Sequence, residues 1–445
     1  MSTNAPPDTA AAESSLRRIL GDGLAVGEAK FAVDGVTPRH VATPSSVEQL
    51  AESLAAANEA GVAVIPWGGG CYMALGSVPS RYDIAMRTTK LDRVSEYEPA
   101  DLTVTVEVGV TFEQLAAVLA EHGQFLPIDA PGEATIGGAL AAAASGPWQH
   151  AYGLPRDWLL GCRIAQADGV LVRGGGRVVK NVAGYDLPRL IVGSLGTLGV
   201  IVEATFKLTP LPATEETLLA VHPSLGAAAD AILAADERGL ALTAAALINA
   251  AAAAKLNASI DVDIDMDPGA GIAAYRIAGG AAAVERTRNE LATLPVDGET
   301  VRLDGDRAAS FWRRLAAPLR RRPDDNAGGV ELKATLPPAS VLGFIAALAD
   351  DDSNAGMPLI AYPTVGVVRA TLADVETDEM ASAVERLRAH AIAAGGSLVV
   401  MRAPVELKRR IDVWGDVDAL PLMRNLKHQF DAASTLNPGR FVGGI

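Results

Sequence analysis

Three glycine clusters in apolar surroundings restrict the fold of this chain more than any other feature. They lie at residues 68–70, at 137–138 and at 193–199, where glycine recurs every third position. Glycine allows positive φ values and lets the backbone approach another group closely. The clusters predict loops that surround a large ligand. From these residues alone, a flexible hairpin at the first cluster and a close-packed helix at the second remain open alternatives.

The first cluster directly follows a predicted buried strand at residues 62–66 and comprises Gly68, Gly69 and Gly70. Consecutive glycines allow successive N–H groups to converge on one point, as in a phosphate-binding nest. The segment lacks the Gly-Lys-Ser/Thr of a Walker A loop and the GxGxxG spacing of dinucleotide-binding folds. It therefore predicts an anion site of another type.

The second cluster opens a short predicted helix that Thr135 can cap. The first turn of a helix offers free N–H groups and attracts an anion. The Ala-rich stretch at residues 139–144 presents only methyl groups. A flat or extended ligand could therefore lie very close to this backbone.

Composition excludes several classes of function. A chain of 445 residues predicts two or three folding units, and its formal net charge of −15 argues against nucleic acid or an anionic membrane surface as the main partner. The two cysteines, Cys71 and Cys162, cannot ligate an iron–sulfur cluster, and the six scattered histidines predict no metal site. Residues 1–15 have neither the basic start nor the apolar stretch of a secretion signal, and we expect a disordered tail on a cytoplasmic protein.

The segment up to residue 210 alternates short strands and helices. We expect a helix over residues 46–59, a second over 112–122 capped by Thr111, a hairpin over 159–172 turning at Asp168 and Gly169, and a strand over 200–208. Proline residues and a charged stretch place a domain boundary near residue 212.

Residues 217–401 read as two similar β-α-β-type halves with long Ala-rich helices. We expect a ferredoxin-like sheet with its helices on one face. A last helix over 420–430 precedes the turn Asn437-Pro438-Gly439, and Arg440 follows that turn as a fixed cation.

Three longer strings carry a family resemblance: KNVAGYDL at 180–187, GSLGTLGVI at 193–201 and NPGRF at 437–441. With the glycine clusters, they resemble the vanillyl-alcohol-oxidase, or PCMH-type, flavoproteins, and within them the FAD-binding E subunits of bacterial glycolate oxidases. The resemblance implies an α+β fold. We expect a disordered tail and lead-in at 1–30, a PCMH-type FAD-binding domain of two α+β subdomains at 31–212, a ferredoxin-like α+β cap domain at 213–405, and a C-terminal segment at 406–445 that returns to the FAD domain.

The resemblance also implies a set of FAD-binding residues. Gly68, Gly69, Gly70 and Cys71 would bind the pyrophosphate. The ribityl and isoalloxazine path would be lined by Pro131, Gly132, Thr135, Gly137, Gly138, Ser145, Gly146, Gly153 and Asp157, and Gly199, Val200 and Ile201 would contact FAD through their backbone. Gly70 stands where relatives with covalent FAD carry histidine, so noncovalent FAD is expected. Cys71 replaces the usual Ser or Thr with a weaker thiol donor.

The catalytic residues are not identified by the resemblance. Relatives that oxidise 2-hydroxy acids carry a His-x-Gly-Asp-Gly-Asn-x-His string, whereas residues 412–418 contain no histidine. His150 and His428 are the nearest candidates, and ordinary packed or surface histidines are the commoner interpretation of each.

The resemblance implies an FAD subunit of a glycolate oxidase or dehydrogenase complex, acting on a small 2-hydroxy acid. Its expected partners are a homologous flavin subunit and an iron–sulfur subunit, with no nucleic acid and no direct insertion into a membrane. The expected location is cytoplasmic, with any membrane association through those partners. A self-sufficient FAD-dependent alcohol or hydroxy-acid oxidase and a non-catalytic assembly subunit remain as alternatives.

Overall fold

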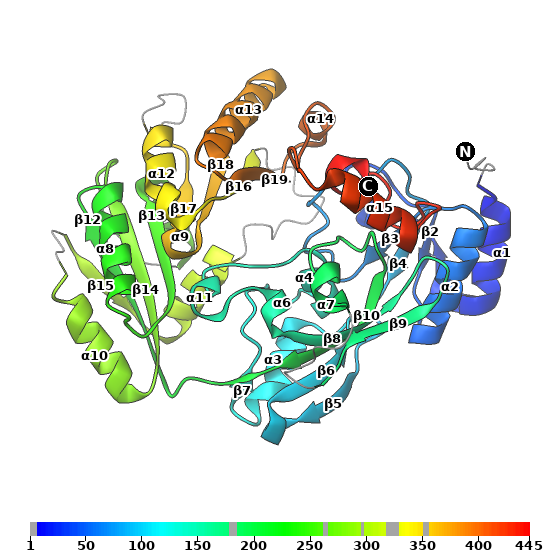
Figure 1. Ribbon diagram of the computed structural model, residues 1–445, viewed down its shortest axis with the longest axis horizontal. Helices are drawn as coiled ribbons and strands as arrows, with labels where there is room; N and C mark the ends of the chain where they lie inside the picture. The colour runs from blue at the N-terminus through cyan, green and yellow to red at the C-terminus, as the bar shows by residue number, and fades with distance from the viewer. Residues whose placement is uncertain (1–6, 178–184, 261–265, 295–297, 317–328, 350–355) are drawn as a thin grey trace.

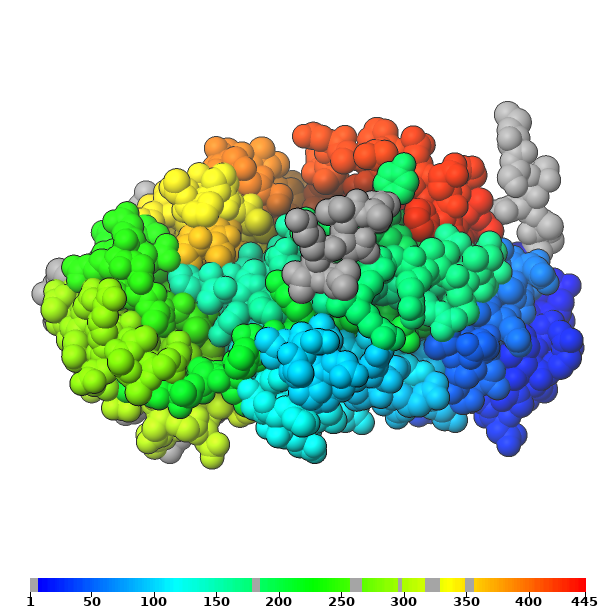
Figure 2. All heavy atoms as spheres, turned by 60° about the horizontal axis from the view of Figure 1, so that its bottom comes forward, coloured from blue at the N-terminus to red at the C-terminus, as the bar shows by residue number. Residues whose placement is uncertain are grey.

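The computed structural model describes residues 7–177, 185–260, 266–294, 298–316, 329–349 and 356–445. An N-terminal module and a cap lie next to each other along the long axis, and the C-terminal segment returns to the N-terminal module (Figure 1). The same arrangement appears in the space-filling view of Figure 2. Among the described residues, no helix combines the length and the apolar character needed to cross a membrane.

The first subdomain of the N-terminal module is a four-stranded sheet with the order β1-β2-β4-β3. Its strands are β1 (Leu24–Val26), β2 (His40–Ala42), β3 (Val64–Trp67) and β4 (Ile84–Arg87). The predicted helix over residues 46–59 is confirmed as α2 (Val47–Glu59), because Ser46 Oγ accepts a hydrogen bond from Gln49 N and caps it. Leu50 and Leu54 of this helix are buried in the core.

The N-terminal segment corrects the expectation of a disordered tail over residues 1–15 and a lead-in to residue 30. Helix α1 (Thr9–Leu20) begins at Asp8, whose carboxylate accepts from Ala11 N at 2.9 Å. Ala12, Leu16 and Leu20 lie on one face and are buried in the same core as α2. The helical spacing of these few apolar residues overrides the polar, Ala-rich composition on which the expectation rested. Residues 1–6 lie outside the described part of the chain.

The second subdomain is a five-stranded antiparallel sheet with the order β5-β6-β10-β8-β9. Its strands are β5 (Val94–Glu98), β6 (Thr103–Glu107), β8 (Leu159–Ala165), β9 (Leu171–Gly175) and β10 (Val200–Lys207). The predicted hairpin is confirmed by the antiparallel pairing of β8 with β9. Helix α3 (Phe112–Ala120) carries the predicted Thr111 cap. The shorter elements are β7 (Gln124–Phe125), α4 (Ile136–Ala141), α5 (Gln149–Tyr152), α6 (Pro155–Trp158), α7 (Leu187–Ile191) and β11 (Thr209–Pro210).

The cap is built on one eight-stranded sheet, ordered β15-β12-β14-β13-β17-β18-β16-β19. Its strands are β12 (Thr214–His222), β13 (Leu242–Asn249), β14 (Gly271–Gly279), β15 (Thr300–Leu303), β16 (Val330–Thr335), β17 (Leu359–Tyr362), β18 (Val367–Leu372) and β19 (Ser397–Arg402). If the four strands of each half are numbered along the chain, both halves have the spatial order 4-1-3-2 of a ferredoxin-like fold. The first half runs in this order from β15 to β13, and the second from β19 to β17. The halves join where β13 pairs with β17, so the ferredoxin-like expectation is confirmed twice over.

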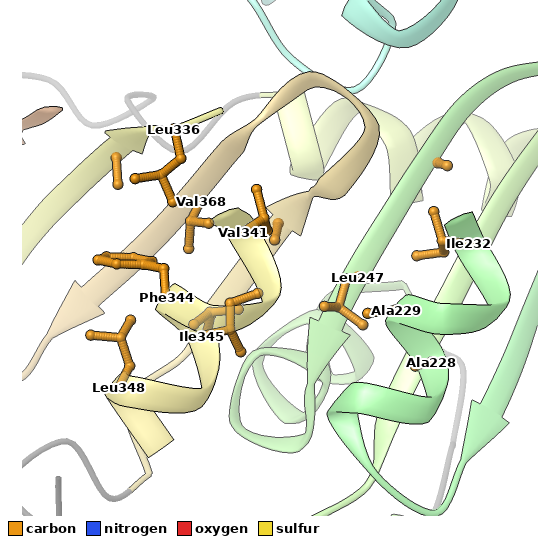
Figure 3. Close-up of a cluster of buried hydrophobic side chains, with 14 of the residues drawn as sticks. Ala228, Ala229, Ile232, Leu247, Leu336, Val341, Phe344, Ile345, Leu348 and Val368 are labelled. Atoms are coloured by element: carbon orange, nitrogen blue, oxygen red, sulfur yellow. The ribbon is translucent and has the colours of Figure 1, made fainter. Parts of the chain in front are cut away.

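The helices of the cap do not all lie on one face. A single core contains α8 (Leu225–Glu237), α10 (Ala281–Leu291), α12 (Val341–Ala349) and α13 (Thr377–Ala393) on one side of the sheet. Figure 3 shows Ile232 of α8 and Phe344 and Ile345 of α12 among the side chains of this core. A separate core, which includes Phe311 and Leu315, packs α9 (Ala250–Ile260) and α11 (Gly305–Ala316) against the other face. The expectation of helices on one face is therefore wrong. The central strands carry apolar residues on both faces of the sheet, so both faces have to be covered.

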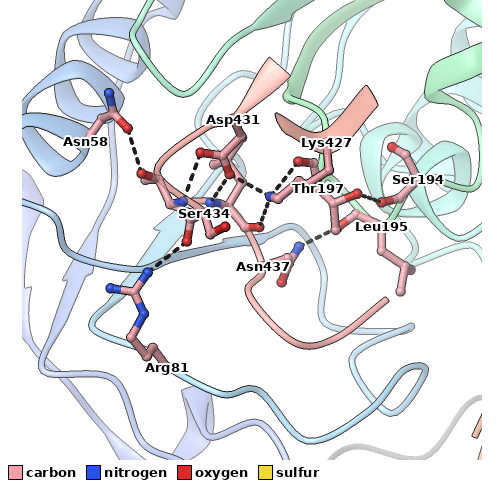
Figure 4. Close-up of polar contacts among 11 residues, drawn as sticks. Asn58, Arg81, Ser194, Leu195, Thr197, Lys427, Asp431, Ser434 and Asn437 are labelled. Atoms are coloured by element: carbon pink, nitrogen blue, oxygen red, sulfur yellow. Dashed lines mark hydrogen bonds and ion pairs between the residues drawn. The ribbon is translucent and has the colours of Figure 1, made fainter. Parts of the chain in front are cut away.

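The C-terminal segment follows α14 (Val405–Lys408) and contains α15 (Leu420–Phe430). It joins the first sheet through a parallel bridge between Leu436 and Val64. Figure 4 shows how Lys427 holds it: Nζ donates to Asp431 Oδ2 at 2.6 Å and to the carbonyl oxygens of Thr197 and Leu436, each at 2.9 Å. The C-terminal segment therefore contacts the third glycine cluster at Thr197.

Candidate functional site

A cleft with an empty volume of about 700 Å³ lies where the two subdomains and the C-terminal segment meet. The chain segments that form its walls come from all three glycine clusters and from the terminal Asn-Pro-Gly turn. Its lining comprises Pro66, Trp67, Gly68, Gly69, Gly70, Cys71, Tyr72, Met73, Thr88, Val108, Thr135, Gly137, Gly138, Ala141, Ala142, Leu195, Gly196, Val200, Ile201, Asn437 and Arg440.

The loop after β3 has space for glycine only. A Cβ on Gly68 would lie 2.2 Å from Thr135 Oγ1, and one on Gly69 would lie 2.7 Å from the carbonyl oxygen of Glu133. Gly70 has a φ of 84°, in the region that side-chain-bearing residues rarely adopt. The bare backbone of this loop therefore lies directly against the second glycine cluster and forms one wall of the cleft.

Helix α4 begins beside this loop, as a short helix capped by Thr135. Thr135 Oγ1 accepts a hydrogen bond from Gly138 N at 3.3 Å and caps the helix. A Cβ on Gly137 would lie 2.9 Å from Val108 Cβ, so the helix start is packed tightly on the second sheet. The two glycines leave the first turn of the helix open to the cleft.

Three buried polar atoms at this cleft have no hydrogen-bond partner within the described part of the chain. They are the hydroxyl of Tyr72, Oδ1 of Asn437 and Nε of Arg440, and all three residues line the cleft. Buried polar groups are almost always hydrogen-bonded, so orphaned atoms at a cavity indicate an absent partner. The walls therefore fit a ligand that combines anionic and polar groups with a flat surface.

A second space of about 490 Å³, which we call the chamber, adjoins the cleft and reaches the cap. It shares Cys71, Tyr72 and Ala142 with the cleft. Its remaining lining residues are Asp129, Pro131, Ala143, Ala144, Ser145, Ala316, Lys333, Arg369 and Met401. A third space of about 770 Å³ shares Asp129, Pro131 and Ala316 with the chamber and is also bordered by Trp148, Arg276 and Trp312.

Two cations of the cap sheet face the chamber. Lys333 of β16 and Arg369 of β18 are cross-strand partners in the antiparallel register. Lys333 Nζ lies 3.3 Å from Ser145 Oγ, and Arg369 Nη1 donates to the carbonyl oxygen of Leu315 at 3.3 Å. Burial and, to a smaller extent, the neighbouring Arg369 together lower the pKa of Lys333 to about 8.

Asp129 is the acidic group of the chamber. Its Oδ2 accepts a hydrogen bond from Trp148 N at 2.6 Å, and Gly146 leaves room for it, since a Cβ there would lie 3.0 Å from the carboxylate. Burial raises the pKa of Asp129 to about 7, against the opposing effects of that hydrogen bond and of Arg276 and Arg369. A carboxyl and an amine that both titrate near neutrality thus border one small space.

The structure brings most of the expected site residues together. Gly68, Gly69, Gly70, Cys71, Thr135, Gly137, Gly138, Val200 and Ile201 line the cleft, whereas Pro131, Gly132 and Ser145 line the chamber or the third space. Gly146 packs against the side chain of Asp129. Gly199 directly precedes Val200, which lines the cleft.

Gly153 and Asp157 do not support the expected flavin path. Both are exposed, and Asp157 Oδ2 accepts from Leu154 N at 2.9 Å, where it caps α6. Of the two histidine candidates, His428 is exposed, and His150 Nδ1 lies 2.8 Å from Thr364 Oγ1 at the junction with the cap. Lys180 and the following residues to 184 lie outside the described residues.

Sequence reasoning missed the chamber. Lys333 and Arg369 stand 36 positions apart, and only the register of β16 against β18 brings them together. The available signal was a cation near the middle of each of these two strands. Asp129 precedes the predicted glycine stretch and carried no signal of its own.

Comparison with known sequences points to one cofactor. The family model of the FAD binding domain matches residues 38–175. Glycolate oxidase subunit GlcD of Bacillus subtilis is 34% identical over 197 residues, which cover 44% of this chain and 42% of that protein. Glycolate oxidase subunit GlcE of Escherichia coli is 44% identical over 122 residues, or 27% of this chain and 35% of that protein.

D-2-hydroxyglutarate dehydrogenase of Xanthomonas citri is 34% identical over 189 residues, which cover 42% of this chain and 40% of that protein. The aligned part thus spans less than half the length of each of these three relatives.

Solved structures match over nearly the whole chain. p-Cresol methylhydroxylase superposes with a TM-score of 0.71 at 18% identity, covering 96% of both chains. Alkyldihydroxyacetonephosphate synthase superposes with a TM-score of 0.69 at 18% identity, covering 98% of this chain and 86% of the other. At this level of identity the likeness concerns the fold.

The cleft fits FAD by its own features. The bare backbone of the glycine loop and the start of α4 suit a pyrophosphate, and the Ala-rich helix suits a flat ring. The buried polar atoms without a partner among the described residues could form hydrogen bonds to the same ligand. Residues 38–175 match the FAD binding domain, so the chain binds FAD, and it has the α+β fold of p-cresol methylhydroxylase.

Proposed function

We propose that this chain is the FAD-binding subunit of a glycolate oxidase or dehydrogenase complex that oxidises a small 2-hydroxy acid, such as glycolate to glyoxylate. The observation that carries the proposal is the chamber, in which Lys333 and Arg369 adjoin the FAD cleft. Two cations at a small buried space suit a carboxylate. The named glycolate oxidase subunits among its relatives support the same reaction class.

The residues of the chamber suit distinct tasks. Lys333 and Arg369 would bind and orient the substrate carboxylate, placing the hydroxyl-bearing carbon toward the cleft. FAD held in the cleft would supply the acceptor for the hydride that leaves this carbon, and that hydride carries two electrons and one proton. The hydroxyl proton is the second to leave, and the Asp129 carboxylate would accept it at the chamber wall.

Electrons then have to leave the subunit. Cys71 and Cys162, the two cysteines of the sequence, are too few to ligate an iron–sulfur cluster. We therefore propose a homologous flavin subunit and an iron–sulfur subunit as partners, with the complex located in the cytoplasm or at a membrane through those partners. The relatives named subunits of glycolate oxidase support a multi-subunit assembly.

Anaerobic stopped-flow absorbance at the flavin maximum tests the proposal. The FAD-loaded chain is mixed with glycolate, first alone and then with a separately purified flavin subunit and iron–sulfur subunit. We expect slow bleaching alone and sustained turnover in the mixture. Turnover that does not depend on the partners would contradict the subunit role, and no bleaching by any 2-hydroxy acid in either mixture would contradict the reaction.

Asp129 and Lys333 favour a second candidate, a self-sufficient FAD-dependent hydroxy-acid or alcohol oxidase. Both groups titrate near neutrality, as an acid–base pair for proton transfer should. Bleaching of the isolated chain at about 1 s⁻¹ or faster would favour this candidate. A non-catalytic assembly subunit accords poorly with the close glycine contacts of the cleft, because a scaffold does not require loops free of side chains.

A further inference from the structure

Two buried cations, Arg440 and Lys408, donate hydrogen bonds to the loop at residues 73–75, which follows the first glycine cluster. Arg440 Nη2 donates to the carbonyl oxygens of Met73, at 2.7 Å, and Leu75. Lys408 Nζ donates to the intervening carbonyl oxygen of Ala74 at 2.6 Å. Consecutive carbonyl groups of one loop are thus bound by side chains that lie more than 330 positions further along the chain.

The charges under this loop do not cancel. Lys408 Nζ also contacts both carboxylate oxygens of Asp34, at 2.9 and 3.0 Å, and the two side chains are 1% and 9% exposed. Asp34 compensates one positive charge, whereas two cations are present, so the group Asp34, Lys408 and Arg440 carries a formal charge of +1. Burial lowers the pKa of both Lys408 and Arg440, because it disfavours the charged form of each.

Arg440 also has an unused donor. Its Nε is buried and has no hydrogen-bond partner among the described residues, and the side chain lines the cleft. The residue is held rigidly, because its carbonyl oxygen accepts from Ser77 N at 2.9 Å and from Trp414 Nε1 at 3.0 Å. A fixed, buried guanidinium with a free N–H at an anion-binding cleft is arranged for a charge-assisted hydrogen bond.

We propose that Arg440 binds the pyrophosphate of FAD through Nε, and that Lys408, paired with Asp34, is a positioning residue that holds residues 73–75 in place for that contact. The proposal rests on FAD as the ligand of the cleft and adds the C-terminal segment to the binding site. The anion supplies the negative charge that the buried group lacks. FAD retention therefore depends on the last six residues of the chain as well as on the glycine loops.

Titration of FAD into the apoprotein, followed by quenching of flavin fluorescence, tests the role of Arg440. Arg440→Met should weaken FAD binding about 10- to 100-fold, because one charge-assisted hydrogen bond is lost. It should also flatten the dependence of log Kd on log [NaCl], because one cation is lost. Arg440→Lys, which keeps the charge but loses the planar fork, should bind with intermediate affinity and near wild-type salt dependence.

The double variant Lys408→Met/Asp34→Asn removes a neutral pair. It should weaken FAD binding about 3- to 10-fold without changing the salt dependence, because it acts only through the loop. Arg409→Met and Arg424→Met are matched controls, since both arginines are exposed on the same segment and lie outside the cleft. Both controls should bind FAD within about twofold of the wild type.

Thermal unfolding of each apoprotein separates binding from folding. An Arg440→Met protein that folds and binds FAD within threefold of the wild type would overturn the proposal. An affinity loss with unchanged salt dependence would also overturn it, because a purely structural role predicts that pattern. If Arg440→Met does not fold, Arg440→Lys decides by affinity alone: an intermediate Kd supports the proposal, and a Kd equal to that of the wild type would overturn it. Failure of the wild-type apoprotein to bind FAD would instead contradict the FAD assignment itself.

Discussion

Lys333 Nζ lies 3.3 Å from Ser145 Oγ, although the two residues are 188 positions apart. This contact joins a cap strand to the loop after the Ala-rich helix α4, so the cap closes the chamber from one side and the N-terminal module closes it from the other. The two cations that would bind a substrate carboxylate therefore come from the cap, whereas Asp129 and the cofactor loops come from the other module. This division underlies the predictions that follow.

The first prediction is that FAD is bound noncovalently. Gly70 offers no side chain for a bond to the flavin, and the family resemblance implies that it stands where relatives with covalent FAD carry histidine. Acid precipitation of the purified yellow protein should release the flavin into the supernatant. Flavin that stays in a washed pellet would contradict this, and the Cys71→Ser variant would then show whether the Cys71 thiol forms the bond.

The second prediction concerns the glycines of the cleft. Gly69→Val and Gly138→Val should each raise the Kd for FAD at least about 100-fold, because overpacking costs about 1–3 kcal/mol and the new side chain occupies ligand space. A Cβ would lie 2.7 Å from the Glu133 carbonyl oxygen in the first variant and 3.2 Å from Thr135 Oγ1 in the second. Isothermal titration with FAD measures the effect.

Gly343→Ala is the matched control for these variants, since no atom lies within 4 Å of the position of its Cβ on helix α12. It should bind FAD as the wild type does. Full FAD occupancy in both valine variants would refute the assignment of these loops to the cofactor.

The third prediction separates binding from stability at Lys333. Lys333→Met should weaken binding of oxalate, a non-oxidisable carboxylate, about 10- to 100-fold, because a charge-assisted hydrogen bond is lost. The same change should raise the melting temperature of the apoprotein or leave it unchanged, because a buried charge is replaced by an apolar group of similar shape. Perturbation of the flavin absorbance spectrum reports oxalate binding. Lys90→Met is the control, because Lys90 is exposed on a loop. Equal oxalate affinity in both variants would remove Lys333 from the anion site.

The fourth prediction is a pH dependence of stability from Asp129. Burial raises its pKa from 3.8 in the free side chain to about 7 in the fold, so the folded chain holds a proton that the unfolded chain releases between these values. The contribution of Asp129 to stability is therefore fully present below about pH 4 and is lost as the pH rises to 7, by about 2–4 kcal/mol.

Thermal unfolding of the apoprotein between pH 4.5 and 7.5 checks this expectation. The wild type should lose stability relative to Asp129→Asn as the pH rises, and the difference should level off above pH 7. The pKa of Lys333 is lowered, so its contribution to the free energy of unfolding increases with pH instead of decreasing. This increase occurs only above about pH 8, outside the range of the experiment. Parallel stability curves for the two proteins across the range would show that Asp129 titrates normally.

Local rules account for what the sequence alone could predict. Thr111 and Thr135 cap the helices that they were expected to cap, because a capping side chain bonds to a backbone N–H only three positions away. The glycine loops line one cleft for a similar reason, since close approach of two backbones excludes every Cβ. The repeated pattern of strands and helices likewise sufficed for the ferredoxin-like cap.

Tertiary structure alone decided the charged groups of the site. Lys333 and Arg369 meet through strand register, Arg440 and Lys408 reach the loop at 73–75 across most of the chain, and the pKa of Asp129 depends on burial by three separate segments. Helix α1 was missed for a related reason, because its few apolar residues gain stability only against α2. Hydrogen-bond geometry within a turn can be read from neighbouring residues, whereas desolvation and pairing of charges depend on which distant segments exclude the water.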